Sequence, residues 1–316
     1  MEPRTGRQGM HVKRRWVAVT LMWTVGVTVL RAHAPNSRSS RPVAPSAARC
    51  TLLAPTQGRP VFVTPGGSFR AVLHGELPAT NVAFELVRDS YPVHRHHLKW
   101  RLLELGATEK RFELLVPPPT PPATYDLVVS VAGQRLTARH AVAVQPLWER
   151  LRLVHLSDMN VDGLTVPDFD WRLVEEVNLY GPTLIVLTGD LLDVTHPDLD
   201  TGWQRLSDFL AAFDAPTVVA CGDHDDPDRY AGYLAPSPLG VIQIGGYRGL
   251  VLYDLPNQPI SNDPAQVEWL EETLLWSATG DLSFIIGHDS CPNLLRHWWQ
   301  QGALLSLIHI SEPTRL

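Results

Sequence analysis

The chain has 316 residues, of which 44% are hydrophobic and 19% charged, a composition that excludes a disordered chain and allows about two globular domains. Its net charge of −6 is unevenly spread, because nine of the 27 basic residues but one of the 33 acidic residues lie within 1–50. Residues 51–316 therefore hold 18 basic and 32 acidic residues, which excludes nucleic acid as the main partner and suits cations instead.

The N-terminus has the pattern of an export signal. Lys13-Arg14-Arg15 precedes an uncharged, largely apolar run over residues 16–30, which is shorter than the roughly 20 residues of a membrane-spanning helix. Ala32-His33-Ala34 offers a cleavage site, whereas Pro35 directly after it is typical of blocked cleavage. Two interpretations stay open, a cleaved signal peptide over 1–34 or an uncleaved N-terminal anchor formed by 16–30. Both predict export to the periplasm or the extracellular space, with membrane contact only through that anchor.

Residues 35–49 are rich in proline, serine and arginine and predict a flexible linker. Over residues 50–146 the hydrophobic pattern changes to a period of two with glycine and proline punctuation, which predicts about seven short strands. Such a series favours an all-β, immunoglobulin-like sandwich. The expected strands are 61–63, 68–73, 82–87, 100–103, 112–116, 125–131 and 141–144.

A histidine cluster lies within this all-β segment, at His94-Arg95-His96-His97. No carboxylate or cysteine accompanies it at the spacing of metal ligands, so a metal site there is disfavoured. Strand alternation places His94 and His96 on one face, which we expect to be solvated.

Residues 147–304 change to strands that alternate with helices, which predicts an α/β domain with central β-sheets flanked by helices. Gly181-Pro182 ends the first helix, and Pro264 begins a later helix at its first position. The expected strands are 152–157, 183–188, 217–221 and 282–286, with a hairpin over 241–255. The expected helices are 170–180, 202–213, 264–276 and 294–301.

Four of these strands end in residues that can bind metal ions, namely Asp158, Asp190, Asp223 and His288. Because strands of an α/β sheet present their carboxyl ends at one edge, we expect these four side chains to converge. Carboxylate oxygens together with imidazole suit Mn, Fe or Zn ions, and a carboxylate shared between two ions builds a two-metal site. The three scattered cysteines of the chain form neither a disulfide framework nor a cysteine-based zinc site.

At these residues the chain resembles the calcineurin-like metallophosphoesterases, whose motifs Asp-x-His, Gly-Asp-x-x-Asp, Gly-Asn-His-Asp/Glu, Gly-His and Gly-His-x-His each follow a strand. The resemblance covers about residues 150–304, where four of the five blocks occur in order. It implies that Asp158 is the first metal ligand, that Asp190 bridges two ions, and that His288 binds the second ion. The preceding β-sandwich also resembles the two-domain layout of purple acid phosphatases.

The resemblance also implies roles for three residues beside the ions. His224 matches the imidazole that contacts the substrate phosphate and assists the leaving group. Asp225 matches the acid that orients this histidine. Asp193, at the end of the second block, is expected to support its loop rather than to bind metal.

The chain departs from the family pattern at two positions. Asn160 replaces the histidine of the first motif, so the first ion would have an amide oxygen or no ligand there, and a metal ligand and a plain turn residue are equally open interpretations. Asp223 replaces the asparagine of the third motif, and its carboxylate can bind a hard ion while adding negative charge beside an anionic substrate. Either change would alter the choice of metal, slow the chemistry or mark a non-catalytic relative.

The last motif, Gly-His-x-His, does not occur after His288. Residues 305–316 instead resemble the translation of a transposon-end adaptor used in sequencing libraries, so we expect an artefactual tail that takes no part in the fold. His309 in this tail is then not a metal ligand. We expect the α/β domain to be incomplete, with its last strand and last motif missing.

The resemblance implies a hydrolase that cleaves a phosphomonoester or phosphodiester with a hydroxide bridging two metal ions, with little or no activity in this chain. The expected partner is a phosphate-ester small molecule or a phosphorylated substrate. The alternative is a degenerate, non-catalytic relative that acts as an exported binding protein. A purely structural cell-envelope protein would leave the ordered strand ends unexplained. The sequence does not indicate the substrate or the oligomeric state.

Overall fold

The computed structural model describes residues 50–75, 81–90, 93–131, 133–146, 151–254, 263–275 and 282–288, together with two short strands. These strands, β1 (Ala18–Val19) and β17 (Leu307–Ile308), pair in parallel. The predicted linker over 35–49, the rest of the 16–30 run and the predicted helix over 294–301 lie outside the described residues. Within the described part of the chain, no helix is long and apolar enough to cross a membrane.

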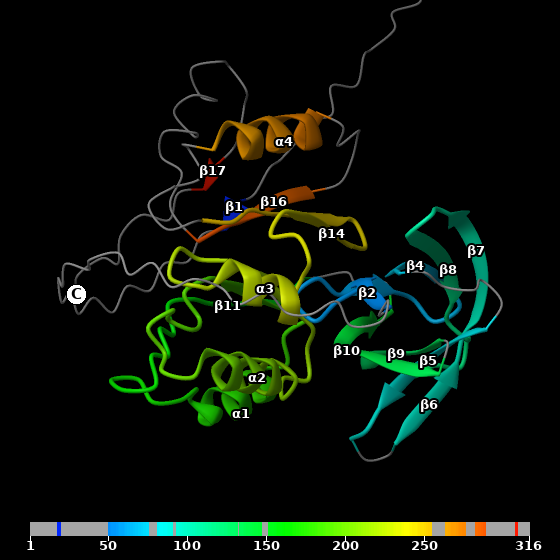
Figure 1. The fold of residues 1–316 in the computed structure, drawn as a ribbon, viewed down its shortest axis with the longest axis horizontal. Coiled ribbons are helices and arrows are strands. Elements are labelled where there is room, and N and C mark those ends of the chain that lie inside the picture. Colours follow the sequence, from blue (N-terminus) through cyan, green and yellow to red (C-terminus); the bar gives the residue numbers. More distant parts are fainter. Residues whose placement is uncertain are drawn as a thin grey trace, which may run out of the picture.

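The first part of the described chain forms two β-sheets (Figure 1). One sheet has the strand order β3-β10-β9-β5-β6, and the other has the order β2-β4-β8-β7. Neighbouring strands are antiparallel except for β3 and β10, which pair in parallel. The strands are β2 (Thr51–Ala54), β3 (Val61–Val63), β4 (Ser68–His74), β5 (Val82–Arg88), β6 (His94–His97), β7 (Lys99–Leu105), β8 (Glu109–Leu115), β9 (Ala123–Val131) and β10 (Gln134–Val144).

Side chains from both sheets fill one hydrophobic core, as the predicted period of two requires. Phe84 from one sheet and Phe112 from the other have ring centroids 5.2 Å apart, and Trp100 lies edge-on to Phe112 at 5.4 Å. Tyr125 is fully buried beside them, and its hydroxyl donates a hydrogen bond of 2.8 Å to Pro121 O. The likeness of this part to immunoglobulin domains stays a prediction.

Strand β2 was not expected from the sequence, and β6 was not among the seven predicted strands, although strand alternation was expected for its histidines. Strand β6 carries the histidine cluster at the edge of its sheet, and its residues alternate as predicted. The solvated face expected for His94 and His96 is wrong, because these two rings stack at 6.1 Å and His96 lies edge-on to buried Tyr125 at 5.9 Å. The exposed face of the strand instead carries Arg95 and His97.

The second part of the described chain contains two three-stranded sheets, with the orders β11-β12-β13 and β14-β15-β16. The first sheet is all parallel, and in the second sheet β15 is antiparallel to β14 and parallel to β16. The strands are β11 (Leu153–Leu156), β12 (Leu184–Thr188), β13 (Thr217–Ala220), β14 (Gly240–Ile244), β15 (Tyr247–Val251) and β16 (Leu282–Ile286). The helices are α1 (Trp171–Tyr180), α2 (Leu199–Leu210), α3 (Pro227–Tyr233) and α4 (Pro264–Leu275).

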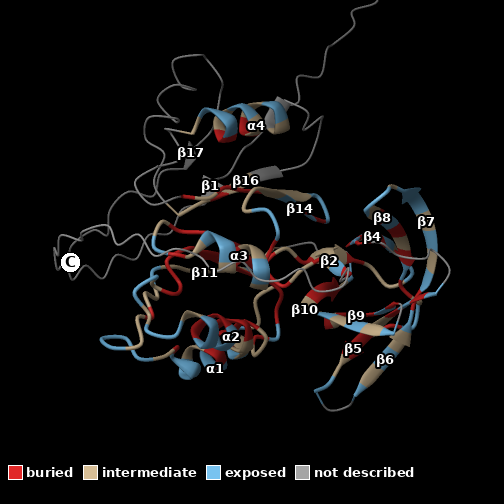
Figure 2. Ribbon diagram, in the orientation of Figure 1, coloured by how far each residue is buried: buried red, intermediate tan, exposed pale blue. Residues whose placement is uncertain are grey.

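The two sheets lie face to face between layers of helices (Figures 1 and 2). Strand β12 is buried on both faces, so Ile185 and Leu187 pack against α1 and α2 while Leu184 and Val186 pack against the second sheet. On the far side of the second sheet, Leu270 of α4 joins a smaller apolar cluster. This four-layer arrangement explains why the strands read as continuous apolar runs.

Most predicted elements of this part are confirmed, with three differences. Helix α2 begins at Leu199, earlier than expected, because Asp198 caps it by accepting a hydrogen bond from Thr201 N. Helix α3, which Asp226 caps and Pro227 begins, was not expected. Strand β16 does not share a sheet edge with β11, β12 and β13, and it reaches the same region from the facing sheet.

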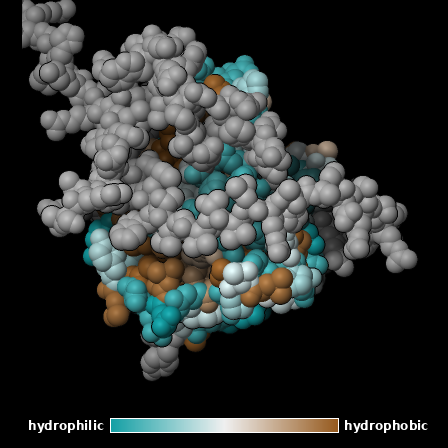
Figure 3. Space-filling model, turned by 90° about the vertical axis from the view of Figure 1, so that its left-hand side faces the viewer, coloured by the Kyte–Doolittle hydropathy of each residue, from teal (hydrophilic) through white to brown (hydrophobic). Residues whose placement is uncertain are grey.

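Exposed apolar side chains are dispersed over the described surface. In the side view of Figure 3, the described surface shows small hydrophobic patches among hydrophilic ones. Scattered apolar residues of this kind are normal on soluble domains.

Replacing Tyr125 with phenylalanine should lower the free energy of unfolding by about 1–2 kcal/mol, because the partly buried hydrogen bond from its hydroxyl to Pro121 O is lost. Urea unfolding followed by circular dichroism measures this change. The matched control is Tyr180→Phe at the exposed end of α1, which should change stability by less than about 0.5 kcal/mol. Equal stability of the two variants would contradict a structural role for the Tyr125 hydroxyl.

Candidate metal centre

The residues predicted to bind metal follow four strands whose ends meet in one region. Asp158 follows β11, Asp190 follows β12, and Asp223 follows β13, and these three strands are parallel neighbours in one sheet. His288 follows β16 and enters from the facing sheet. The structure therefore brings together side chains that are up to 130 positions apart in the chain.

The loops after β11 and β12 are joined by backbone hydrogen bonds. Asp158 N donates to Gly189 O at 3.2 Å, and Asn160 N donates to Asp190 O at 2.8 Å. Asp158, Asn160 and Asp190 have φ angles of 56°, 45° and 54°, in the left-handed region that few residues other than glycine adopt. Aspartate and asparagine tolerate this region best, and such residues concentrate at functional sites. The backbone thus fixes the direction of these three side chains.

Two glycines allow the loops after β12 and β13 to touch. A Cβ atom added to Gly222 would lie 2.3 Å from Asp190 Oδ1, and one added to Gly189 would lie 2.6 Å from Gly222 Cα. Gly189 also has a φ of 91°, which side chains rarely permit. Both motif glycines are therefore required by the close approach of the two loops.

Asp225 holds these two loops together. Its buried carboxylate accepts four backbone hydrogen bonds of 2.9–3.2 Å, from the amides of Gly222, Asp190, Leu191 and Leu192. Burial raises the pKa of this carboxyl to about 6, although the amide donors favour its charged form. Asp225 therefore acts on the backbone of the metal-binding loops.

The role of orienting His224, predicted for Asp225, falls to Asp193 in the structure. Asp193 Oδ2 lies 3.4 Å from His224 Nδ1, whereas Asp225 uses its carboxylate on the four amides. Asp193 also caps its own loop by accepting a hydrogen bond of 2.7 Å from Thr195 N. From its position at the end of the second motif, Asp193 was expected only to support its loop, because motif positions do not show which acid lies beside the His224 ring.

Asp190 lies at the centre of the cluster. Its Oδ1 accepts a hydrogen bond of 3.0 Å from His224 N, and its Oδ2 lies 3.4 Å from His288 Nε2. Burial opposes ionisation of this carboxyl, but the hydrogen bond and charge of His288 outweigh it and lower its pKa. Asp190 is thus a charged carboxylate with only 8% of its side chain exposed.

His288 is held in place by a backbone carbonyl. Its Nδ1 donates to Thr188 O at 2.7 Å, which directs Nε2 toward Asp190 and Asp223, the latter at 3.3 Å. Burial disfavours the charged ring. The hydrogen bonds of the ring with Asp190 and Thr188, together with the negative charges of Asp190 and Asp158, outweigh burial and raise the pKa of His288 to about 10. A hydrogen bond from the second ring nitrogen to a carbonyl is the usual way of orienting a metal-binding histidine. The carbonyl of Thr188 could not have been found from the sequence, because it is a backbone group.

The side chains form two groups of three possible metal ligands. The ligand atoms of Asp158, Asp190 and His288 lie within 4.8 Å of one another, as do those of Asp190, Asp223 and His224. Asp190 belongs to both groups. Oxygen and imidazole donors of this kind fit Mn, Fe or Zn ions, and a shared carboxylate fits a pair of ions. Asn160 lies in the same region through its backbone contact with Asp190.

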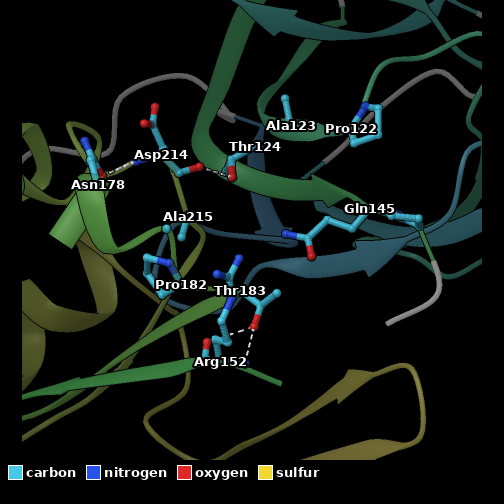
Figure 4. Close-up of a pocket in the computed structure, with 12 residues that line it drawn as sticks. Pro122, Ala123, Thr124, Gln145, Arg152, Asn178, Pro182, Thr183, Asp214 and Ala215 are labelled. Carbon is cyan, nitrogen blue, oxygen red and sulfur yellow. Dashed lines mark hydrogen bonds between the residues drawn. The ribbon is translucent and has the colours of Figure 1, made fainter. Parts of the chain in front are cut away.

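A surface cavity of about 400 Å³ lies elsewhere, where the two parts of the chain meet (Figure 4). Thr124 from the first part and Asp214 from the second are joined there by a hydrogen bond of 2.7 Å, and Arg152 and Thr183 lie below them. None of the candidate metal ligands lines this cavity. The chemistry of the strand ends, rather than this cavity, marks the candidate site.

Comparisons with known proteins agree with this geometry. The profile of the calcineurin-like phosphoesterase family matches residues 151–312, and so continues past residue 304 into the segment that we expect to be artefactual. An uncharacterised metallophosphoesterase from Campylobacter jejuni is 31% identical over 84 residues, which are 27% of this chain and 22% of that protein. A probable cyclic nucleotide phosphodiesterase from a Synechococcus species is 29% identical over 119 residues, which are 36% of this chain and 41% of that protein.

The matches thus span less than half the length of these relatives. Among solved structures, a purple acid phosphatase from yellow lupin seeds aligns with 68% of this chain and 47% of its own, at 12% identity and a TM-score of 0.37.

Replacing Asp225 with asparagine should lower the free energy of unfolding by about 3 kcal/mol, because one amide oxygen cannot accept four backbone hydrogen bonds. Chemical unfolding measures the loss, and metal titration should show weaker binding because the Asp190 loop is released. The matched control is Asp228→Asn on the exposed start of α3, with an expected change below about 0.5 kcal/mol. An Asp225→Asn variant as stable as this control would contradict the assigned role.

The affinity for Mn²⁺ should rise with pH between pH 7 and 9, by up to about tenfold per unit, because the ion must displace the proton on His288 Nε2. The sign follows from a pKa raised to about 10, since the ring is protonated throughout this window. Calorimetry in two buffers with different ionisation enthalpies should detect about one released proton per ion at this site. His288→Asn should abolish the release, whereas His97→Asn, at an exposed ring of β6, should not. An affinity that is independent of pH would contradict His288 as a ligand.

Proposed function

Because the chain belongs to the calcineurin-like phosphoesterase family, we propose that it is a hydrolase of phosphate esters that uses two metal ions. The observation that carries this proposal is the position of Asp190, which is shared by both groups of candidate ligands. Asp158 and His288 complete one group, and Asp223 belongs to the other. The ions, when bound, supply an activated water and neutralise the charge of the phosphoryl oxygens.

We assign His224 to the substrate side of the site. Its side chain is 54% exposed beside the buried cluster, and Asp193 holds the ring through its nitrogen Nδ1. Burial opposes protonation, but the nearby carboxylates outweigh it and raise the pKa of His224. The protonated form, which this shift favours, can donate a proton to the leaving oxygen or a hydrogen bond to the phosphate.

The two departures from the family pattern act on charge and on ligand number. Asp223 adds a carboxylate 3.3 Å from His288 Nε2, and we propose that it binds the second ion more strongly than the asparagine of the family motif would. Asn160 offers at most one neutral amide oxygen to the first ion, so that ion should be held less tightly.

We further propose that the chain in its present form turns over slowly. The Gly-His-x-His motif, whose histidines would complete both ion sites, does not follow His288 in the sequence. With His224 assigned to the substrate, the second group of described ligands offers an ion two carboxylates, Asp190 and Asp223, against the three protein ligands and the open position of catalytic sites. We keep the proposal that 305–316 is an artefactual tail.

A second candidate function is a non-catalytic, exported binding protein on the same scaffold. Asn160 and Asp223 favour it, because both replace residues of the family motifs. In this case the β-sheet part over 50–146, which we propose to be immunoglobulin-like, would serve as the interaction module. Export through residues 1–34, followed by the linker 35–49 and the phosphoesterase domain over 147–304, is common to both candidates.

Assays can decide whether the substrate is a phosphomonoester or a phosphodiester. One relative is named a probable cyclic nucleotide phosphodiesterase, so cyclic nucleotides should be assayed beside simple aryl phosphates. Both substrates present the same phosphoryl group to the ions and differ in the second ester oxygen.

With Mn²⁺ supplied, the chain should bind metal and should hydrolyse p-nitrophenyl phosphate or its diester more slowly than about 1 s⁻¹. Asp190→Asn should abolish both, because it removes the shared carboxylate, whereas Asp228→Asn should leave both unchanged. Metal content of the purified protein and release of nitrophenol measure the two effects. Absence of bound metal and of turnover with Mn, Fe and Zn would support the binding protein instead. Fast turnover would contradict the incomplete site.

A further inference from the structure

A tight turn of the first part of the chain reaches into the second part. Residues 56–59 connect β2 and β3, and the turn is closed by two hydrogen bonds of 3.2 Å between Thr56 and Arg59. Gln57 in this turn exchanges two hydrogen bonds with Ser207 of α2, at 2.8 and 2.6 Å, although the residues are 150 positions apart. The turn is thus built into the α/β part.

The turn also covers the edge of the sheet that carries the candidate site. Strand β13 is the last strand in the order β11-β12-β13, and one side of its backbone has no neighbouring strand among the described residues. On that side Val219 N donates to Gly58 O at 3.1 Å, and Arg59 Nη1 donates to Val219 O. The turn therefore takes the place of a further strand beside β13.

The same turn binds the segments that follow the loop 222–225. Gly58 N donates to Leu234 O, just after α3, at 3.0 Å, and Arg59 Nη2 donates to Pro238 O at 2.7 Å. The buried hydroxyl of Tyr230 in α3 donates to Val219 O at 2.7 Å, so Arg59 and Tyr230 meet at one carbonyl. The loop is therefore bracketed, before and after, by backbone that the turn holds.

The contact leaves little room for adjustment. A Cβ atom on Gly58 would lie 2.9 Å from Leu234 Cβ, and one on Gly240 would lie 2.8 Å from Arg59 Nε. The guanidinium hydrogen bonds go to three backbone carbonyls, those of Gly58, Val219 and Pro238. The planar guanidinium of arginine holds its N–H donors in fixed directions, which suits three carbonyl acceptors. The ammonium group of a lysine cannot reproduce this geometry.

We propose that Arg59 is a positioning residue for the candidate metal centre, which it serves by fixing β13 and α3 on either side of the loop 222–225. This inference rests on the proposed function and adds to it a residue from outside the α/β part. Asp223 and His224 lie in that loop. The Asp225 carboxylate accepts hydrogen bonds from the amides of Gly222 and Asp190, so a shift of Asp225 would also move Asp190. Small shifts of Val219 would therefore change both groups of ligands.

A second contact between the two parts provides a matched control. Arg139 of β10 forms an ion pair with Asp208 of α2, and this pair touches neither β13 nor α3. Loss of the pair would weaken the docking of the two parts without freeing the loop. Comparison of the two arginines therefore separates positioning of the site from docking in general.

The test uses the full chain and Co²⁺ alone as the probe, with binding followed by the visible absorption of the ion. Arg59→Gln should weaken Co²⁺ binding by about tenfold or more, Arg59→Lys by less, and Arg139→Gln by no more than about twofold. In the metal-free protein, hydrogen exchange at the amides of 190–192 should become about tenfold faster in Arg59→Gln and stay unchanged in Arg139→Gln.

Wild-type affinity and exchange in Arg59→Gln would overturn the proposal, and so would an equal loss in Arg139→Gln. If Arg59→Gln does not fold, the same comparison is made between Arg59→Lys and Arg139→Gln, with the same two deciding outcomes. The exchange measurement needs no metal, so it tests Arg59 even if the wild-type chain binds no Co²⁺ and the proposed function fails.

Discussion

The arrangement of the site depends on one buried carboxylate. Asp225 draws together the backbone amides of two loops that follow neighbouring strands, and the lack of side chains at Gly189 and Gly222 lets these loops meet. A negative charge buried in this way is tolerated only when hydrogen-bond donors surround it. Four amides donate hydrogen bonds to this carboxylate, and the same hydrogen bonds fix the positions of the amides. The position of Asp190 relative to His224 is thus a consequence of backbone hydrogen bonding rather than of contacts between their side chains.

Around this frame the structure gathers three carboxylates, of which only that of Asp190 is buried. Asp158, Asp190 and Asp223 all face His288, whose protonated ring balances part of their charge in the absence of metal. When these carboxylates hold a metal ion, His288 would have to give up the proton on Nε2 to bind it. Carboxylates of the same cluster raise the pKa of His224. Under the proposed function, one cluster would therefore both bind cations and favour the protonated form of the residue that assists the leaving oxygen.

The sequence predicted the α/β elements well where hydrophobic periodicity and strand-end motifs coincided, as at β12 with Asp190 and β13 with Asp223. It predicted that Asp158, Asp190 and Asp223 lie together because they follow parallel neighbouring strands of one sheet, whereas His288 joins them from the facing sheet, which strand direction alone does not predict. It failed where the partner is a backbone group or lies far away in the chain. Asp225 was assigned to His224 because motif spacing does not reveal buried amides, and the inward face of His96 depended on a strand pairing with no local signal. Arg59 was missed since two of its three acceptors, Val219 O and Pro238 O, are backbone carbonyls of distant segments.

The turn over 56–59 has one more consequence, which concerns solubility rather than chemistry. Strand β13 ends its sheet, and open sheet edges recruit strands from other molecules. By saturating both backbone groups of Val219, the turn shields this edge from intermolecular pairing. An α/β part separated from its preceding β-sheets would present a bare strand to its neighbours and invite aggregation. The turn protects this edge only while the two parts of the chain stay joined.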